Sequence, residues 1–520
     1  MPDENQEPLK PPTPPPGDGT ADRRDGKQPK PVNLDLVSQE MHQGARAGDR
    51  YVRVVRPYGH LFQRIGPGYL RATEEVLEPK TPLGRALSAL KHVFIGQPLP
   101  SYAEREERLS KIKALAIFSS DAISSVAYAT EEILFVLALG GTAALALSVP
   151  ISLVIALLLC IVAFSYRQTV FAYPNGGGSY VVSKENIGTL AGLVAAAALM
   201  LDYILTVSVS IASGTAAITS AFSFLFPYRV PIALFFILIM IVGNLRGIRE
   251  SGNIFAAPTY VFLFSLCALI AIGAVRAFLG LTPVEPVHAG PLPQQEAIGF
   301  WLILTAFSAG SVAMSGTEAI SNGVPAFKPP ESKNAATTLL VMAGILAFFF
   351  MGIGLLANLN GISVTDDETV LSQLARGVLG KGFLYYVIQF ATMAILVLAA
   401  NTSFNGFPRL AAIIARDGFM PRRFTTRGDR LAFSYGIIVL GGVAALLIVA
   451  FEGDTHLLIP LYAVGVFLAF TLSQVGMMRH WLRLRSPGWK RSMSINAVGA
   501  AMCAVVLVIA AVTKFSRGAW

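Results

Sequence analysis

The sequence predicts an all-α, polytopic membrane protein. Hydrophobic residues make up 53% of the 520 residues and charged residues only 14%, whereas soluble domains average about 25% charged residues. Apolar windows long enough to cross about 30 Å of hydrocarbon recur along the chain. Three of these windows contain a carboxylate, at Asp121, Asp202 and Glu318. An ionisable group is costly in hydrocarbon, so it usually faces the bundle interior and marks an ion or substrate path. The chain is therefore predicted to be a transporter.

The chain divides into four predicted parts. Residues 1–35 are rich in proline, glycine and charge with little to bury, which predicts a disordered cytoplasmic tail. Residues 36–110 are mixed and polar and are expected to form a cytoplasmic amino-terminal extension. Residues 111–480 are expected to form a ten-helix transport core, and residues 481–520 a cytoplasmic loop and an eleventh helix.

Eleven windows are predicted to cross the membrane. They lie near 112–138, 146–166, 188–222, 230–245, 254–280, 300–323, 336–358, 382–414, 432–451, 456–478 and 494–514. If the amino end is inside, the outer loops contain only four basic residues, Arg229, Arg276, Arg376 and Lys381. The positive-inside rule then predicts a cytoplasmic amino terminus in the plasma (inner) membrane. The net charge of +9 is explained by this topology. We therefore expect the lipid bilayer as a partner and no nucleic acid.

Two of the windows show signs of helix interruption. In the first, SSDAISSVAY places small hydroxyl residues around Asp121, where they compete for backbone hydrogen bonds. In the sixth, SAGSVAMSGTEAISNG contains Gly310, Gly316 and Gly323, which let a helix unwind beside a polar cavity. These windows correspond if the first ten form two inverted repeats of five, which points to a midplane substrate site. Alternatively, the small residues only permit close helix packing.

Polar side chains form stripes on two of the predicted helices. Asp121 and Tyr128 are two turns apart, and Asp202, Thr206 and Ser210 follow at four-residue steps. Carboxylate, hydroxyl and carbonyl oxygens suit a hard cation that exchanges its hydration shell for protein oxygens. Divalent ions take the same ligands, so the residue types indicate a metal cation or a proton without naming the ion.

Five further polar or aromatic side chains lie outside the two stripes. Tyr203 points about 100° away from the Asp202 stripe on an ideal helix, and Tyr462 alone is more typical of an interfacial anchor or core residue. Glu131 and Glu132 lie near the predicted outer end, where we expect solvation. His456 is isolated near a segment end, which favours a surface or structural role.

Six motifs in order carry a resemblance over roughly residues 105–520. They are SSDAISSVAYATEEI, YPNGGGSYVVSKENIG, LDYILTVSVSIASG, NLRGIRESG, SGTEAISNGVPAF and NTSFNGFPRLAAIIARDGFMP. Together they resemble the amino acid, polyamine and organocation permease superfamily, and more closely its KimA-like potassium importers. The resemblance implies a LeuT-type fold of five-plus-five inverted repeats and potassium import by proton symport through alternating access.

The resemblance also implies particular residues. The potassium and substrate positions fall on Asp121, Tyr128, Asp202, Tyr203, Thr206, Ser210, Ser315 and Tyr462, with Asp121 and Asp202 as the potassium carboxylates. Ser315 stands where the family pattern has a threonine, and it keeps the hydroxyl. Glu318 corresponds to the proton-coupling acid. No cofactor is implied.

KimA-like importers continue after the GAW motif into a twelfth helix and a cytoplasmic carboxyl-terminal domain. This sequence ends at Trp520, so we expect it to be truncated before that helix. The resemblance also suggests a homodimer formed through the carboxyl-terminal domain, and inhibition by cyclic di-AMP.

The main alternative function is an amino acid permease of the same fold. Such permeases read the substrate carboxylate with a glycine-rich break in the first segment. Here the break contains Asp121 and has no glycine between Ile117 and Leu139. An ionised acid there repels a carboxylate, which favours the cation. A channel would need a continuous pore, and a sensor would need an output domain. An enzyme would need a nucleophile or a cofactor motif, which the sequence lacks.

Overall fold

The computed structural model describes two separate units of the chain, Met1–Leu90 and Lys91–Trp520. The described residues are 38–43, 50–55, 62–66, 69–72, 81–82, 108–176, 178–246, 252–285, 287, 292–365, 367–428, 432–461 and 463–515. The expected disordered tail, residues 1–35, lies outside them.

Two small β-hairpins form the described part of the first unit. Strand β1 (Ser38–Gln43) pairs antiparallel with β2 (Arg50–Val55), and β3 (Phe62–Gly66) pairs antiparallel with β4 (Tyr69–Ala72). The sequence interpretation of residues 36–110 as a polar extension contained no strands. The valines of RYVRVV in β2 are the signal it overlooked, because β-branched residues favour strands.

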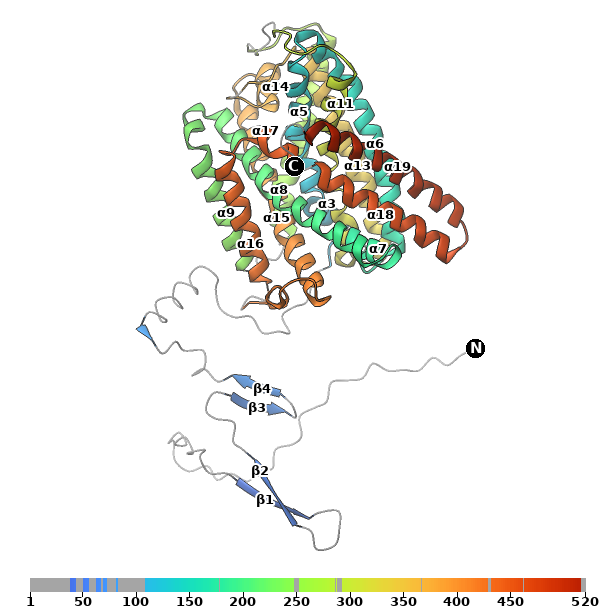
Figure 1. Ribbon diagram of the computed structural model, residues 1–520. Coiled ribbons are helices and arrows are strands. Elements are labelled where there is room, and N and C mark those ends of the chain that lie inside the picture. Colours follow the sequence, from blue (N-terminus) through green and yellow to red (C-terminus); the bar gives the residue numbers. More distant parts are fainter. Residues whose placement is uncertain are drawn as a thin grey trace. The chain divides into compact units, whose positions relative to one another are not determined.

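The named elements in the described residues of the second unit are all helices (Figure 1). Its first half contains α3 (Lys111–Phe118), α4 (Ser120–Ser124), α5 (Val126–Ala138), η2 (Thr142–Leu147), α6 (Ser148–Ala172), α7 (Ser179–Asn186), α8 (Thr189–Ala221), η3 (Ser223–Tyr228), α9 (Arg229–Leu245) and α10 (Gly252–Phe278), where η marks a 3₁₀ helix. Its second half contains α11 (Phe300–Gly310), η4 (Ser311–Met314), α12 (Ala319–Asn322), η5 (Val324–Ala326), α13 (Glu331–Leu359), α14 (Val370–Leu379), α15 (Phe383–Arg416), η6 (Arg422–Thr425), α16 (Ser434–Ala450), α17 (Thr455–Leu458), η7 (Ile459–Leu461), α18 (Ala463–Leu484) and α19 (Trp489–Phe515).

The multi-pass membrane character of the sequence is confirmed. Among the described residues, 8 helices are long and apolar enough to cross a membrane. Of the other predicted windows, the first is divided among α3, α4 and α5, the ninth is the 17-residue α16, and the tenth contains α18. Helix α9 shows why lipid is the expected surroundings: Phe235 and Leu238 on it are 58% and 57% exposed, although both are large and apolar.

Each of the first four predicted segments packs against the segment five positions later. Helix α5 of the first segment contacts α11 of the sixth, and α6 contacts α13. In the same way α8 contacts α15, and α9 contacts α16. In Figure 1, α14 and α7 lie at opposite ends of this bundle, and we call these the α14 end and the α7 end.

Both predicted helix interruptions are confirmed. The first segment breaks at Ser119 and Ser125, which separate α3, α4 and α5. The sixth changes from α11 to the 3₁₀ helix η4, passes through a turn at residues 315–318, and resumes as α12. At the first break, the Ser124 hydroxyl donates to the carbonyl oxygen of Asp121 at 2.9 Å, which is the side-chain competition expected of serine.

Candidate functional site

The two interrupted segments meet at their breaks. Gly316 has a φ of +72°, and a Cβ at that position would lie 2.7 Å from Oδ2 of Asp121. Only glycine permits this backbone to approach the carboxylate so closely without strain. The Ser125 hydroxyl adds a direct link, because it donates to the carbonyl oxygen of Ala313 at 3.1 Å. The breaks therefore form one continuous polar region.

Three buried carboxylates gather around this region. Asp121 lies on α4, Asp202 on α8 and Glu318 in the turn before α12, with exposed fractions of 6%, 7% and 3%. Asp121 and Asp202 interact electrostatically, and both act on Glu318. Within the described part of the chain, Oδ1 of Asp121, Oε1 of Glu318 and Oγ of Ser315 have no hydrogen-bond partner. Buried oxygens of this kind need a donor or a cation to offset their desolvation.

The hydroxyl groups of the predicted site are also buried. Tyr128 on α5 is 5% exposed, lies within electrostatic reach of Asp121 and Asp202, and faces Ser315. Thr206 and Ser210 are 3% and 1% exposed. Helix α8 is unbroken from Thr189 to Ala221, so Asp202, Thr206 and Ser210 keep the single stripe that their spacing predicts.

Tyr203 lies at the edge of the site, on the side of α12. Its hydroxyl accepts a hydrogen bond from Nδ2 of Asn322 at 3.5 Å. Its ring lies against α15, where a Cβ at Gly406 would come within 2.6 Å of the tyrosine Cζ. Tyr203 thus joins α8, α12 and α15 on one side of the carboxylates. Tyr462 lies outside the described residues.

The sequence interpretation missed the role of helix α7. The Ser179 hydroxyl, at the start of α7, donates to Oε2 of Glu318 at 2.9 Å. The loop before α7 packs tightly on α12, because a Cβ at Gly178 would lie 2.5 Å from Oδ1 of Asn322. The glycines of YPNGGGSY were the available signal, since a glycine run indicates close backbone approach.

The expectation that Glu131 and Glu132 are solvated was wrong. The two glutamates are 7% and 3% exposed rather than solvated. His456 is not isolated: its Nδ1 lies 2.5 Å from Oε1 of Glu132 and its Nε2 lies 3.7 Å from Oε1 of Glu131. These residues are 324 positions apart in the chain, and no local pattern indicates that α17 returns to α5.

The donor set of the site consists of oxygens. Among the described residues, no group of three or more His, Cys, Asp or Glu side chains is placed to hold a metal ion tightly. Separate carboxylates and hydroxyls around a polar break are instead suited to a hard cation that binds, moves on and is released.

Comparisons with known proteins agree with this chemistry. The sequence model of the amino acid permease family matches residues 109–517. The potassium transporter KimA of Bacillus subtilis (strain 168) is 51% identical over 429 residues, which cover 82% of this chain and 70% of that protein. A probable potassium transport system protein Kup of Vibrio cholerae serotype O1 (strain M66-2) is 25% identical over 349 residues, covering 65% of this chain and 53% of that protein.

Proposed function

The chain belongs to the amino acid permease family, and we propose that within this family it imports potassium ions together with protons by alternating access. The observation that carries the proposal is the oxygen-lined region where α4 meets the turn at residues 315–318, next to Asp202. The 51% identity to a potassium transporter supports the same substrate.

Asp121 is the residue that favours a cation over an amino acid. It lies buried in the break of the first segment, where its carboxylate faces Gly316. A permease for amino acids would present backbone N–H groups to the substrate carboxylate there. A carboxylate there can bind a cation instead, and with Asp202, Thr206, Ser210 and Ser315 it supplies the hard oxygen ligands that potassium takes.

Glu318 is the proposed site of proton coupling. The potassium ion is the counter-charge for Asp121 and Asp202, and both carboxylates act on Glu318. Binding the ion therefore changes the cost of ionising Glu318, which links proton occupancy to potassium occupancy. Through the Ser179 hydroxyl, the charge state of Glu318 reaches α7, and this contact is suited to control opening at the α7 end.

The proposed topology places the α7 end in the cytoplasm. Lys184, Arg416, Arg422 and Arg483 belong to α7 or to segments at the ends of α15 and α18, and a concentration of basic loop residues favours the cytoplasmic side. The amino terminus is then cytoplasmic and the protein lies in the plasma membrane. The packing of segments five positions apart supports the two inverted repeats of five that alternating access requires.

An amino acid permease is the second candidate, favoured by the family itself. One measurement separates the two: rubidium uptake into proteoliposomes that contain the purified chain, with and without an inward proton gradient, for the wild type and Asp121→Asn. We expect gradient-stimulated uptake that the variant loses, because asparagine lacks the charge. Accumulation of amino acids without rubidium would establish the permease function instead.

A further inference from the structure

A small cavity whose lining includes two carboxylates lies next to the proposed potassium site, toward the α14 end. It has a volume of about 20 Å³, enough for one water-sized guest. Tyr128 forms one wall, and the others include Glu131, Glu132, Ser213, Thr369 and Thr455. Because Tyr128 lines both the cavity and the proposed potassium site, the cavity adjoins the ion path on the side away from α7.

The charges around this cavity do not cancel. Glu131 and Glu132 are both buried on α5, and His456 spans the two carboxylates. Asp454 on the neighbouring loop also acts on both Glu131 and His456. Even with a positively charged imidazole, the ionised carboxylates leave a negative balance. A cavity with this balance and oxygen ligands attracts a cation.

Ser213 indicates independently that a ligand belongs there. The residue lies on α8, lines the cavity and is 6% exposed. Its Oγ has no hydrogen-bond partner among the described residues, unlike Thr215 on the same helix, whose hydroxyl donates to the carbonyl oxygen of Ile211 at 2.9 Å. A buried hydroxyl that does not bond to its own helix is left for a guest in the cavity.

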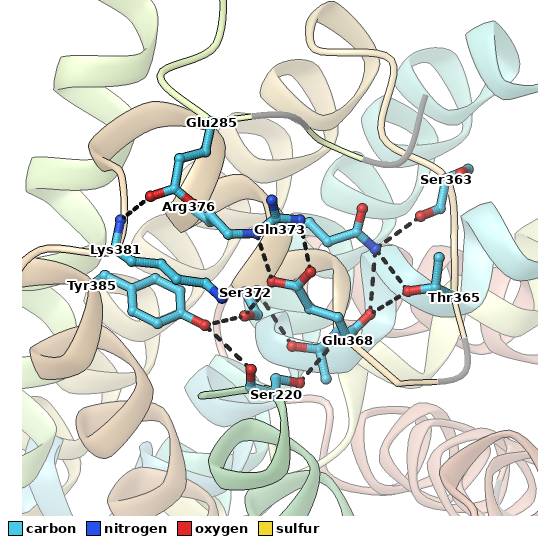
Figure 2. Close-up of polar contacts among 11 residues, drawn as sticks. Ser220, Glu285, Ser363, Thr365, Glu368, Ser372, Gln373, Arg376, Lys381 and Tyr385 are labelled. Atoms are coloured by element: carbon cyan, nitrogen blue, oxygen red, sulfur yellow. Dashed lines mark hydrogen bonds and ion pairs between the residues drawn. The ribbon is translucent and has the colours of Figure 1, made fainter. Parts of the chain in front are cut away.

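The start of helix α14 borders the cavity and is held by several polar contacts. The backbone N–H of Val370, at its start, donates to Oε2 of Glu131 at 3.1 Å. Nη2 of Arg376 lies 2.8 Å from Oε2 of Glu368, with the two side chains only 11% exposed. Figure 2 shows how Ser372 joins this pair to Tyr385. Residues 368–379, which we call the α14 cover, thus combine this polar network with apolar side chains buried in the core, and the Val370–Glu131 hydrogen bond joins the cover to α5.

The cover is also fastened to α8. The backbone N–H of Thr369 donates to Oγ of Ser220 at 3.0 Å, and the Tyr385 hydroxyl lies 3.4 Å from the carbonyl oxygen of the same serine. A cation in the cavity would thus be enclosed between α5, α8 and α14.

We propose that this cavity is a second cation site, an outer station that binds one dehydrated potassium ion between Glu131, Glu132 and Ser213 before it passes Tyr128. The inference rests on the proposed potassium import and adds a site that precedes the Asp121 region. Two successive sites suit transport, because an ion entering the first promotes departure from the second.

The test compares rubidium uptake kinetics of Glu131→Gln and Ser213→Ala with the wild type. Loss of one charge-assisted ligand is expected to raise KM about tenfold for Glu131→Gln, with a smaller rise for Ser213→Ala and with kcat nearly unchanged. Glu452→Gln is the matched control: this exposed glutamate lies in the loop that leads to α17, and its variant should keep the wild-type KM. An unchanged KM in both station variants, or a fall in kcat alone, would overturn the station and leave potassium import standing.

A second measurement covers the case in which Glu131→Gln loses the α14 contact and fails to fold. The wild-type structure determined in thallium(I) should show an anomalous peak within coordination distance of Oγ of Ser213, and Ser213→Ala should weaken it. Peaks confined to the Asp121 and Asp202 region would refute the station alone. No peak at either place, together with no rubidium uptake, would refute the proposed function as well.

Discussion

Glu318 combines three properties that a proton-coupling residue needs. It is buried, it lies within the field of two other carboxylates, and it has a hydrogen bond to an element outside its own segment. The first two make its charge sensitive to whether a cation is present. The third links the charge of Glu318 to the position of α7, because Ser179 is the first residue of that helix.

At this residue we predict that Glu318→Gln separates potassium movement from the proton gradient. Glutamine keeps the size and can still accept from Ser179, but it cannot release a proton. Rubidium exchange between equal concentrations should persist, and stimulation by an inward proton gradient should disappear. Ser179→Ala is the companion variant, in which stimulation is retained but shifted in its pH dependence. Full stimulation in Glu318→Gln would exclude this residue as the coupling group.

A surface contact between α7 and α15 has its own pH dependence. Nζ of Lys184 lies 2.7 Å from Oδ2 of Asp417, and the Tyr180 hydroxyl also donates to that oxygen. These two hydrogen bonds, the lysine's being the larger influence, lower the pKa of Asp417 below its usual value. A lowered pKa means that the contact stabilises the fold above the unfolded-state pKa, and that this gain is lost as the pH falls through the folded-state pKa.

We therefore predict that Asp417→Asn destabilises the protein at pH 7 by less than about 1 kcal/mol, because the pair is partly exposed. The difference from the wild type should begin to shrink below about pH 4, the ordinary pKa of aspartate, and should disappear below the lowered folded-state pKa, where the wild-type carboxylate is also neutral. Thermal unfolding in detergent at pH 7 and at pH 3 measures both values. Asp367→Asn, at an exposed aspartate, is the control and should show no difference at either pH.

At the level of elements, the turn at residues 315–318 depends on Gly316. Its positive φ costs an L-residue about 1–2 kcal/mol, and the added Cβ would meet both the Asp121 carboxylate and the backbone nitrogen of Ala122, the latter at 2.8 Å. The glycine thus keeps the interrupted sixth segment in contact with α4.

Gly316→Ala is predicted to reduce rubidium uptake at least tenfold. Distortion of the turn should weaken ion binding by about 1.4 kcal/mol or more, and that free energy corresponds to a factor of ten in affinity. Gly442→Ala on α16 is the matched control, because a Cβ there meets nothing within 4 Å. That variant should transport normally and be as stable as the wild type or slightly more so. Equal uptake in the two variants would mean that the close approach at Gly316 is not needed.

The element scale also marks where prediction from the sequence succeeds. Serine clusters and glycines correctly predicted both helix breaks, because these residues act on the backbone of their own segment. The α8 stripe followed from spacing alone. By contrast, the contact of His456 with Glu131 and the hydrogen bond of Ser179 to Glu318 depend on how distant segments pack, which no local pattern encodes. Tyr462, predicted from a resemblance, remains a prediction.

At the scale of the whole molecule, a polar closure joins distant segments at each end of the bundle. The α14 end closes through Val370 and Glu131, and the α7 end through Ser179 with Glu318 and Lys184 with Asp417. Helix α14 also packs apolar side chains into the core, and α7 packs against α8 and α18. Because the polar closures at the two ends involve different residues, opening one end at a time is the motion that we propose.

Alternating access predicts that the station is reached from the α14 end in only part of the cycle. In a background without Cys160, Cys267 and Cys503, Ala217→Cys places a thiol in the wall of the cavity. Its modification by a membrane-impermeant cationic thiol reagent should change severalfold on adding potassium, because the ion shifts the population of open and closed states. An exposed Glu452→Cys should react at one rate throughout. A channel would keep its path open to the reagent, so labelling of Ala217→Cys that ignores potassium while rubidium flux continues would favour a continuous pore over a carrier.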